Sequence, residues 1–315
     1  MDGGVRMKTI ERILVVVDHM TDHQPAISKA IYLAKQSSAS IELFLVVYSS
    51  QLVSHWSFDK KQMKAMKDEY IASKFRWLET YLSDVVAQGL TVKLDVCWHK
   101  NFVEAVLEKS ESSNADLVVK STHQHPSFNK IFFTPSDWQL LQQSNAPLLL
   151  VKKQTKSHYK TIMAAVNPTK DEGKEAGLDN TILDTSIGLV ALCEASIHIC
   201  HCYQPLGFEL WQGMSSVGME QSVASPSFEE YQQGIKEHHQ KLFDELLEDF
   251  GFDEYSTHLV EGEVEYELPQ LVDKYQTDLL VVGMGNEVKF FGNSVENILD
   301  NVHCDILSVK VAKPN

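Results

Sequence analysis

The chain has 315 residues, of which 43% are hydrophobic, and this is enough to form the apolar cores of two ordinary domains. A formal net charge of −15 argues against nucleic acid and anionic membrane surfaces as partners, because both require a basic face on the protein. No apolar run approaches the roughly 20 residues that would span a bilayer, so no membrane insertion is expected. Five cysteines, an odd number, in a chain without a signal-like start favour a cytoplasmic location over a disulfide framework.

The first half of the chain alternates between apolar runs and segments with helical spacing. Ile13 to Val17 reads ILVVV, which is typical of a strand buried on both faces, and Asp18 follows it. A helix is expected from Pro25 onward and a second strand over Ile41 to Val47. The other elements expected in this half are helices at Met63 to Ala87, Phe102 to Lys109 and Asp137 to Gln143, and strands at Val92 to Cys97, Leu117 to Val119 and Leu148 to Val151. No hairpin signal separates the strands, so the pattern predicts an α/β domain with a doubly wound, five-stranded parallel sheet.

The same order of elements begins again after a polar segment, Lys152 to Ser157, which we interpret as a linker. A strand at Ile162 to Val166, a helix at Leu178 to Cys193 and a strand at Ile197 to Cys202 repeat the opening of the first half. The sequence is therefore an internal duplication, with expected domains at residues 1–153 and 158–315.

A glycine-rich loop precedes the last helix and strand of the second half. It leaves a strand at Leu279 to Val282 and contains Gly283, Gly285, Gly292, Asn293 and Ser294. At the carboxyl end of a parallel strand, such a loop is where anions and nucleotides bind, because backbone N–H groups and the helix dipole point at them. The offset between the halves is 162 residues from Asp116 to Asp278 but 158 from Leu148 to Ile306, so this loop has lost about four residues.

These features resemble the universal stress protein superfamily, whose domain has a first strand ending in Asp and a G-x2-G-x9-G-[ST] loop before its last helix and strand. The resemblance also rests on Trp98-His99, on Asp116-Leu117-Val118 with His123-Gln124-His125, and on Phe133-Thr134-Pro135-Ser136-Asp137-Trp138. It covers about residues 10 to 312 and is closest to tandem-type members with two domains in one chain. It implies a Rossmann-like fold of the adenine nucleotide alpha hydrolase type, with the domains packed as a pseudo-dimer through Leu148 to Val151 and Ile306 to Val309.

In nucleotide-binding members of the superfamily, the first-strand Asp and a main-chain group hold adenine, while the loop glycines and a Ser or Thr hold ribose and phosphates. The C-terminal half departs from this pattern, with Asn167 at the Asp position and Asn286 at the second glycine position. The ligand site that the resemblance implies here consists of Val166, Asn167, Gly283, Gly285, Gly292, Asn293 and Ser294. ATP or another nucleotide is its implied ligand; the alternative is that the glycines only provide turn geometry.

The N-terminal half departs further from the nucleotide pattern. Ser121, Gln124 and Thr134 stand at the three glycine positions and Pro135 at the Ser/Thr position, so this cleft is not expected to accept ATP. The residues expected around this degenerate cleft are Asp18, His99, Ser121, His123, His125 and Thr134. The histidines either fill the old cleft with hydrogen bonds or contact a ligand, and no metal site is predicted.

Two further segments have alternative interpretations. Cys200-His201-Cys202 resembles a metal-binding fragment, but its place in a buried strand favours packing, with both cysteines on one face. Leu206 to Phe228 is a long loop rich in Phe, Leu, Trp and Met. It either covers a cleft as a lid or pocket wall, or is buried against the other half or a second chain.

No catalytic arrangement emerges, because no serine has a G-x-S-x-G context and no Walker loop is present. The sequence thus predicts a cytoplasmic stress-response protein that acts by binding a ligand or partner and is not an enzyme. Two rival functions stay open, namely an ATP-binding switch with slow hydrolysis in the C-terminal half and a carrier of an apolar or amphipathic small molecule under Leu206 to Phe228. Association into a homodimer also stays open.

Overall fold

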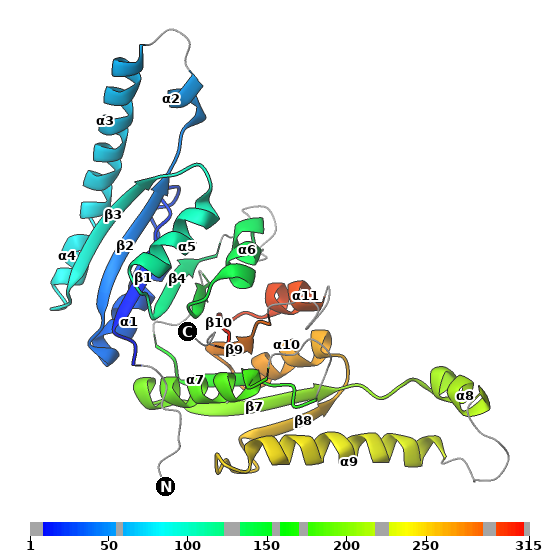
Figure 1. The fold of residues 1–315 in the computed structure, drawn as a ribbon. Helices are drawn as coiled ribbons and strands as arrows, with labels where there is room; N and C mark the ends of the chain where they lie inside the picture. Colours follow the sequence, from blue (N-terminus) through cyan, green and yellow to red (C-terminus); the bar gives the residue numbers. More distant parts are fainter. Residues whose placement is uncertain are drawn as a thin grey trace.

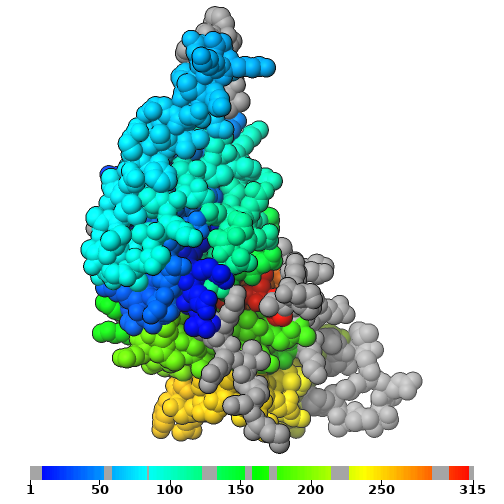
Figure 2. Space-filling model, turned by 60° about the vertical axis from the view of Figure 1, so that its left-hand side comes forward, coloured from blue at the N-terminus to red at the C-terminus, as the bar shows by residue number. Residues whose placement is uncertain are grey.

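The computed structural model describes residues 9–54, 59–122, 133–152, 158–169, 176–217, 227–285 and 294–311. The two halves lie one above the other in Figure 1, and in Figure 2 the blue and cyan first half lies above the green and yellow second half. The N-terminal half contains β1 (Arg12–Val16), α1 (Pro25–Ser37), β2 (Ser40–Val47), α2 (Ser50–Ser54), α3 (Lys60–Glu79), α4 (Leu82–Val86), β3 (Val92–Trp98), α5 (Phe102–Ser112), β4 (Leu117–Ser121), α6 (Pro135–Gln143) and β5 (Leu148–Val151). The C-terminal half contains β6 (Thr161–Ala165), α7 (Leu178–Cys193), β7 (Ser196–Tyr203), α8 (Phe208–Val217), α9 (Phe228–Leu247), β8 (Thr257–Glu261), α10 (Val264–Lys274), β9 (Leu279–Gly283), α11 (Ser294–Asn301) and β10 (Asp305–Val309).

All of these strands form one sheet, in the order β3-β2-β1-β4-β5-β10-β9-β6-β7-β8. The five strands of each half are parallel to one another, which confirms the two predicted doubly wound sheets. Strands β5 and β10 join the halves edge to edge and are antiparallel, with Leu149 opposite Leu307. The two sheets are therefore continuous through the strands that were predicted to meet.

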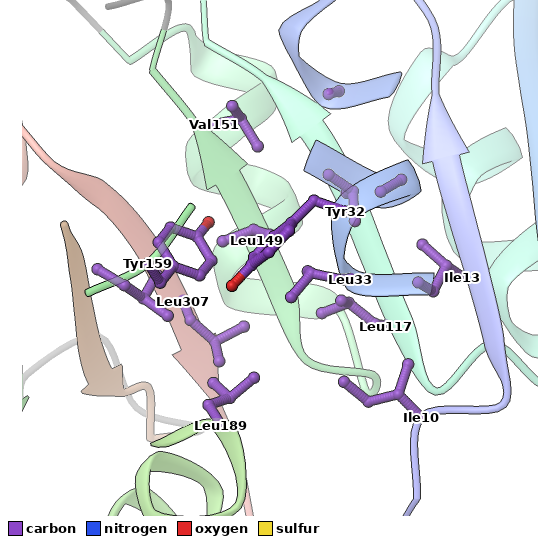
Figure 3. Packing of buried hydrophobic residues seen from close by; sticks show 14 of the residues in the cluster. Ile10, Ile13, Tyr32, Leu33, Leu117, Leu149, Val151, Tyr159, Leu189 and Leu307 are labelled. Carbon is purple, nitrogen blue, oxygen red and sulfur yellow. The ribbon is translucent and has the colours of Figure 1, made fainter. Parts of the chain in front are cut away.

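Helices cover both faces of the sheet, which explains why its strands are continuous apolar runs. Ile13 and Val15 face one core, which includes residues of α1 and α7, while Leu14 and Val16 face a second core with residues of α5, α6, α10 and α11. Figure 3 shows the first core where Leu33 of α1 lies near Leu149 and Leu307. This core crosses from one half of the molecule to the other.

The duplication extends to a carboxylate that ties the start of the first strand to the fourth in each half. Asp116 Oδ2 accepts hydrogen bonds from the two N–H groups at the start of β1, at 3.1 and 3.0 Å. Asp278 Oδ2 does the same at the start of β6, at 2.7 and 3.1 Å. The predicted equivalence of Asp116 and Asp278 is thus confirmed in their contacts.

Two sequence expectations are wrong. The helix expected over Met63 to Ala87 is divided into α3 and α4, and Thr80 between them donates a hydrogen bond from Oγ1 to Trp77 O at 2.6 Å. Lys152, assigned to the polar linker, is buried: its backbone N donates to Asp305 Oδ1 at 2.8 Å and its Nζ to Leu299 O at 2.8 Å. The rest of that segment, residues 153–157, lies outside the described residues.

Candidate functional site

The N-terminal half places a carboxylate at the start of the helix that follows its degenerate loop. Helix α6 begins with a capping box, in which Thr134 Oγ1 accepts a hydrogen bond from Asp137 N at 3.2 Å. Asp137 Oδ2 accepts from Thr134 N at 2.8 Å and from Thr134 Oγ1 at 2.7 Å. Pro135 between them has no backbone N–H. The backbone donors of Thr134 and Asp137 are therefore already engaged within the chain.

A buried lysine balances the charge of this carboxylate. Lys120 of β4 places Nζ 2.7 Å from Asp137 Oδ1 and 3.0 Å from Ser121 O. The Lys120 side chain is 6% exposed and that of Asp137 is 0% exposed. This pair was not predicted, although a lysine inside an apolar strand is a signal that could have identified it. The C-terminal half has Val282 at the position of Lys120, so the pair belongs to the N-terminal half alone.

The other predicted residues of the N-terminal cleft lie at the carboxyl ends of β1, β3 and β4. Asp18 Oδ1 accepts from Met20 N at 2.9 Å, while its backbone N donates to Gln24 Oε1 at 3.4 Å. Gln24, which the sequence analysis missed, is buried and also donates to Thr21 O at 2.6 Å. Ser121 Oγ accepts from Ala26 N at 3.1 Å. Side chains of this half therefore bond to the backbone around the cleft.

The side chain of His99 also forms hydrogen bonds with the neighbouring backbone. Its Nδ1 lies 2.6 Å from Asn101 O and 3.2 Å from Asn101 N, in the turn before α5. Asn101 then caps α5, because its Oδ1 accepts from Glu104 N at 3.3 Å. These contacts favour the interpretation that His99 fills the old cleft with hydrogen bonds to the backbone. His123 and His125 lie outside the described residues.

In the C-terminal half, the predicted adenine-side residues follow β6. Val166 is buried and its N donates to Cys200 O at 3.0 Å, which extends the β6–β7 pairing. Asn167 Oδ1 accepts from Thr169 Oγ1 at 2.7 Å, and Asn167 N donates to Asp179 Oδ1 at 3.0 Å. Asp179, on the first turn of α7, was also missed by the sequence analysis. Its side chain accepts a hydrogen bond from the backbone N that follows the first strand, as the side chain of Gln24 does in the N-terminal half.

Gly283 has a packing role that the sequence analysis did not foresee. It ends β9 and is buried, and a Cβ built on it would lie 2.7 Å from Leu178 Cγ and 2.9 Å from Ile182 Cδ1. The absence of a side chain thus lets α7 approach β9 closely. Gly285 follows at intermediate exposure, whereas Gly292 and Asn293 lie outside the described residues, as does the side chain of Ser294 at the start of α11.

The Cys200-His201-Cys202 segment packs as predicted. Cys200 belongs to the core on one face of the sheet and Cys202 packs against it, and burial raises the pKa of the Cys202 thiol to about 12. His201 is buried, with Nε2 2.9 Å from His239 Nδ1. Cys304 is buried in the same core as Cys200. Within the described ranges, no group of three or more His, Cys, Asp and Glu side chains could hold a metal ion.

The described part of the loop Leu206 to Phe228 forms α8, which extends away from the sheet in Figure 1. Phe208 and Leu210 are 52% and 63% exposed. The ring of Phe228 at the start of α9 lies 5.3 Å from that of Phe208 and 5.5 Å from that of Trp211. Phe208 and Trp211 therefore pack on Phe228 at the start of α9, while Leu210 stays exposed. None of the helices in the described parts of the chain combines the length and hydrophobicity that a membrane span requires.

Two doubly wound units joined through their last strands, each with polar residues at the carboxyl ends of its strands, define a tandem Rossmann-like α/β protein. The chain belongs to the universal stress protein family, whose sequence profile matches residues 9–152 and, a second time, residues 158–310. The family predicted from the sequence is thus confirmed, together with its repetition in one chain.

Relatives match this chain over nearly its whole length. The chain is 27% identical to Universal stress protein E of Photorhabdus laumondii over 312 residues, which cover 96% of both chains. It is 27% identical to Universal stress protein E of Escherichia coli K12, covering 96% of this chain and 95% of the relative. A protein of unknown function from Pseudomonas aeruginosa PAO1 shares its fold with a TM-score of 0.72 at 18% identity, covering 97% of this chain and 94% of the other.

Proposed function

We propose that this stress protein acts by binding a small ligand or a partner, not by catalysis, and that its N-terminal cleft does not take ATP. The observation that carries the proposal is the Asp137 carboxylate at the start of α6, held by Thr134 and by the buried Lys120. A phosphate at a helix start needs free backbone donors and a positive field. Here Thr134 N and the Lys120 ammonium group are bonded to the Asp137 carboxylate and Asp137 N is bonded to Thr134 Oγ1, so a polyphosphate would meet like charge.

The C-terminal cleft is the one that we propose for a small ligand. It lacks a counterpart of the Lys120–Asp137 pair, because Val282 and Val295 stand at those positions. The glycines and Ser294 that the family resemblance implies for phosphate binding are retained in part, so ATP or another nucleotide is the first ligand to test. A slow ATPase switch in this half is the alternative to simple binding. A cytoplasmic location and a homodimer stay predictions.

Equilibrium dialysis with ATP tests the proposal through a matched pair of variants. Ser136 and Ser294 occupy equivalent positions on the first turns of α6 and α11, so Ser136→Glu and Ser294→Glu add the same charge to the two clefts. We expect the wild type to bind no more than one ATP per chain. This binding should be lost in Ser294→Glu and unchanged in Ser136→Glu. Binding that is lost in Ser136→Glu, or two ATP per chain, contradicts the proposal. Phosphate release during the same incubation separates the ATPase switch from binding alone.

The structure gives little support for a carrier that holds an apolar molecule under Leu206 to Phe228. Helix α8 carries Phe208, Leu210 and Trp211 of that loop and extends away from the sheet in Figure 1, and Phe208 and Leu210 are exposed to solvent. A passenger held under this helix is therefore not our proposal.

A further inference from the structure

The molecule contains the same junction between its halves twice, related by a pseudo-two-fold axis between Leu149 and Leu307. Matched strand registers fix the equivalent residues: Ile13 faces Leu117 as Ile162 faces Leu279. Helices α1 and α7 both end one residue before a left-handed residue, Ser38 and Glu194, and so align without a gap. Three equivalent pairs at the junction follow, namely Ile10 with Tyr159, Lys29 with Thr185, and Pro147 with Asp305.

One copy of the junction is filled by a buried ion pair. Lys29 Nζ lies 3.2 Å from Asp305 Oδ2, and the two side chains are 3% and 0% exposed. The hydroxyl of Tyr159 donates to Asp305 Oδ2 at 2.7 Å, and Lys29 Nζ lies 3.9 Å from the centre of the Tyr159 ring. The long side chains from both halves thus occupy the space between α1 and β10.

The other copy is open, because shorter side chains stand in place of those three. Ile10, Pro147 and Thr185 all line a cavity of about 780 Å³. This volume is within the range of pockets that bind small molecules. The cavity's apolar wall comes from both halves and includes four leucines that Figure 3 shows, Leu33, Leu149, Leu189 and Leu307. A pocket with such a wall accepts the apolar body of a ligand.

The charged side chains of the lining are predominantly acidic. Glu111, Asp116 and Asp184 contribute carboxylates, whereas Lys310 contributes an ammonium group that donates to Gln142 O. Burial raises the pKa of Asp184. An excess of carboxylates in a partly enclosed space disfavours anions and suits a hydroxyl, amide or ammonium group. The same excess of carboxylates disfavours nucleotides, because their phosphates are anionic.

We propose that this junction cavity binds a small neutral or cationic amphipathic molecule, with its apolar body against the leucines and its polar end near Asp184. The site is separate from the nucleotide clefts: it reaches Asp116 and Leu279, at the start of β4 and β9, whereas the clefts lie beyond the carboxyl ends of those strands. It goes beyond the proposed function and does not depend on ATP binding.

Fluorescence titration with N-phenylnaphthylamine, a neutral apolar probe, tests this site in the full-length protein. We expect saturable enhancement that ATP does not displace. Thr185→Trp fills the cavity and should weaken probe binding by about tenfold or more, while Thr91→Trp, the same change at an exposed position outside the lining, leaves it unchanged. No saturable binding, or equal binding to Thr185→Trp, overturns the proposal.

Two further measurements keep the test decisive. If Thr185→Trp does not fold, as judged by circular dichroism, Thr185→Leu replaces it and should weaken binding by about threefold or more. The charge preference is tested with anilinonaphthalene sulfonate, the anionic analogue, which should bind more weakly than the neutral probe to the wild-type cavity. Tighter binding of the anionic probe, lost in Thr185→Trp, contradicts the preference for neutral or cationic ligands.

Discussion

At the scale of single residues, Gly283 shows why a family motif does not by itself identify a ligand contact. A methyl group added there would overlap Leu178, so we expect Gly283→Ala to lower the free energy of unfolding by about 1–3 kcal/mol through overpacking. Gly234, exposed within α9 with nothing near its missing Cβ, is the matched control. Gly234→Ala should raise stability by about 0.5–1 kcal/mol, because alanine favours helices. Urea unfolding of both variants measures this, and equal effects would contradict the packing role.

The same contact limits how ATP binding can be tested. A loss of binding in a variant of Gly283 would follow from disturbed packing of α7 as readily as from a lost phosphate contact. The charge substitutions at Ser136 and Ser294 avoid this ambiguity, because they compare equivalent positions in the two halves.

His258 lies in a cluster of stacked rings with His198 and Tyr275. Its Nε2 lies 2.9 Å from His198 Nδ1, and both imidazoles stack on Tyr275. Burial, with additional contributions from His198 and Lys274, lowers the pKa of His258 from 6.5 to about 4. Between these two pH values the unfolded chain binds more protons than the folded one, so stability is lost as the pH falls from 6.5 towards 4.

Substitution of His258 should reduce this pH dependence. In His258→Gln, we expect the free energy of unfolding to fall less steeply between pH 6.5 and about 4 than in the wild type. His238→Gln removes an exposed histidine of α9 and serves as the control. Urea titrations across this pH window measure the slopes. The same slope in His258→Gln and the wild type would show that this histidine pair does not drive the acid sensitivity.

At the scale of elements, the start of α6 depends on a charge pair. Asp137→Asn leaves Lys120 buried without its carboxylate partner and should cost about 3–5 kcal/mol of the free energy of unfolding. Adding Lys120→Met removes the uncompensated charge, so the double variant should recover much of that loss. Chemical denaturation of the wild type, Asp137→Asn, Lys120→Met and the double variant measures the coupling. If the double variant is as unstable as Asp137→Asn plus an independent Lys120→Met, the two residues are not energetically paired.

Elements defined by continuous patterns were predictable from the sequence. Helix α7 and strand β5 have the predicted bounds, because apolar spacing and flanking polar residues mark them. The division between α3 and α4 was not predictable, since no glycine or proline marks Thr80. The sequence located the candidate site but did not explain its residues. The packing role of Gly283 depends on Leu178, and the contacts of Thr134 depend on Asp137, which Lys120 holds. These partners are brought together only by the fold.

For the molecule as a whole, duplication has produced two halves that have the same fold and differ in the side chains at their junction. The Asp116 and Asp278 contacts are preserved in both halves, whereas the junction is filled by Lys29 and Asp305 on one side and left open at Thr185 on the other. Such differences cannot arise between identical subunits of a symmetric dimer. A single chain with two unequal junctions can therefore hold a site that exists once per molecule.

The two halves form one continuous sheet through β5 and β10, and amide hydrogen exchange can measure this continuity strand by strand. We predict that the amides of Leu148–Val151 and Asp305–Val309 exchange as slowly as those of β1 and β6, because pairing on both sides protects them. Exchange as fast as in the edge strands β3 and β8 would contradict the continuous sheet and, with it, the shared junction.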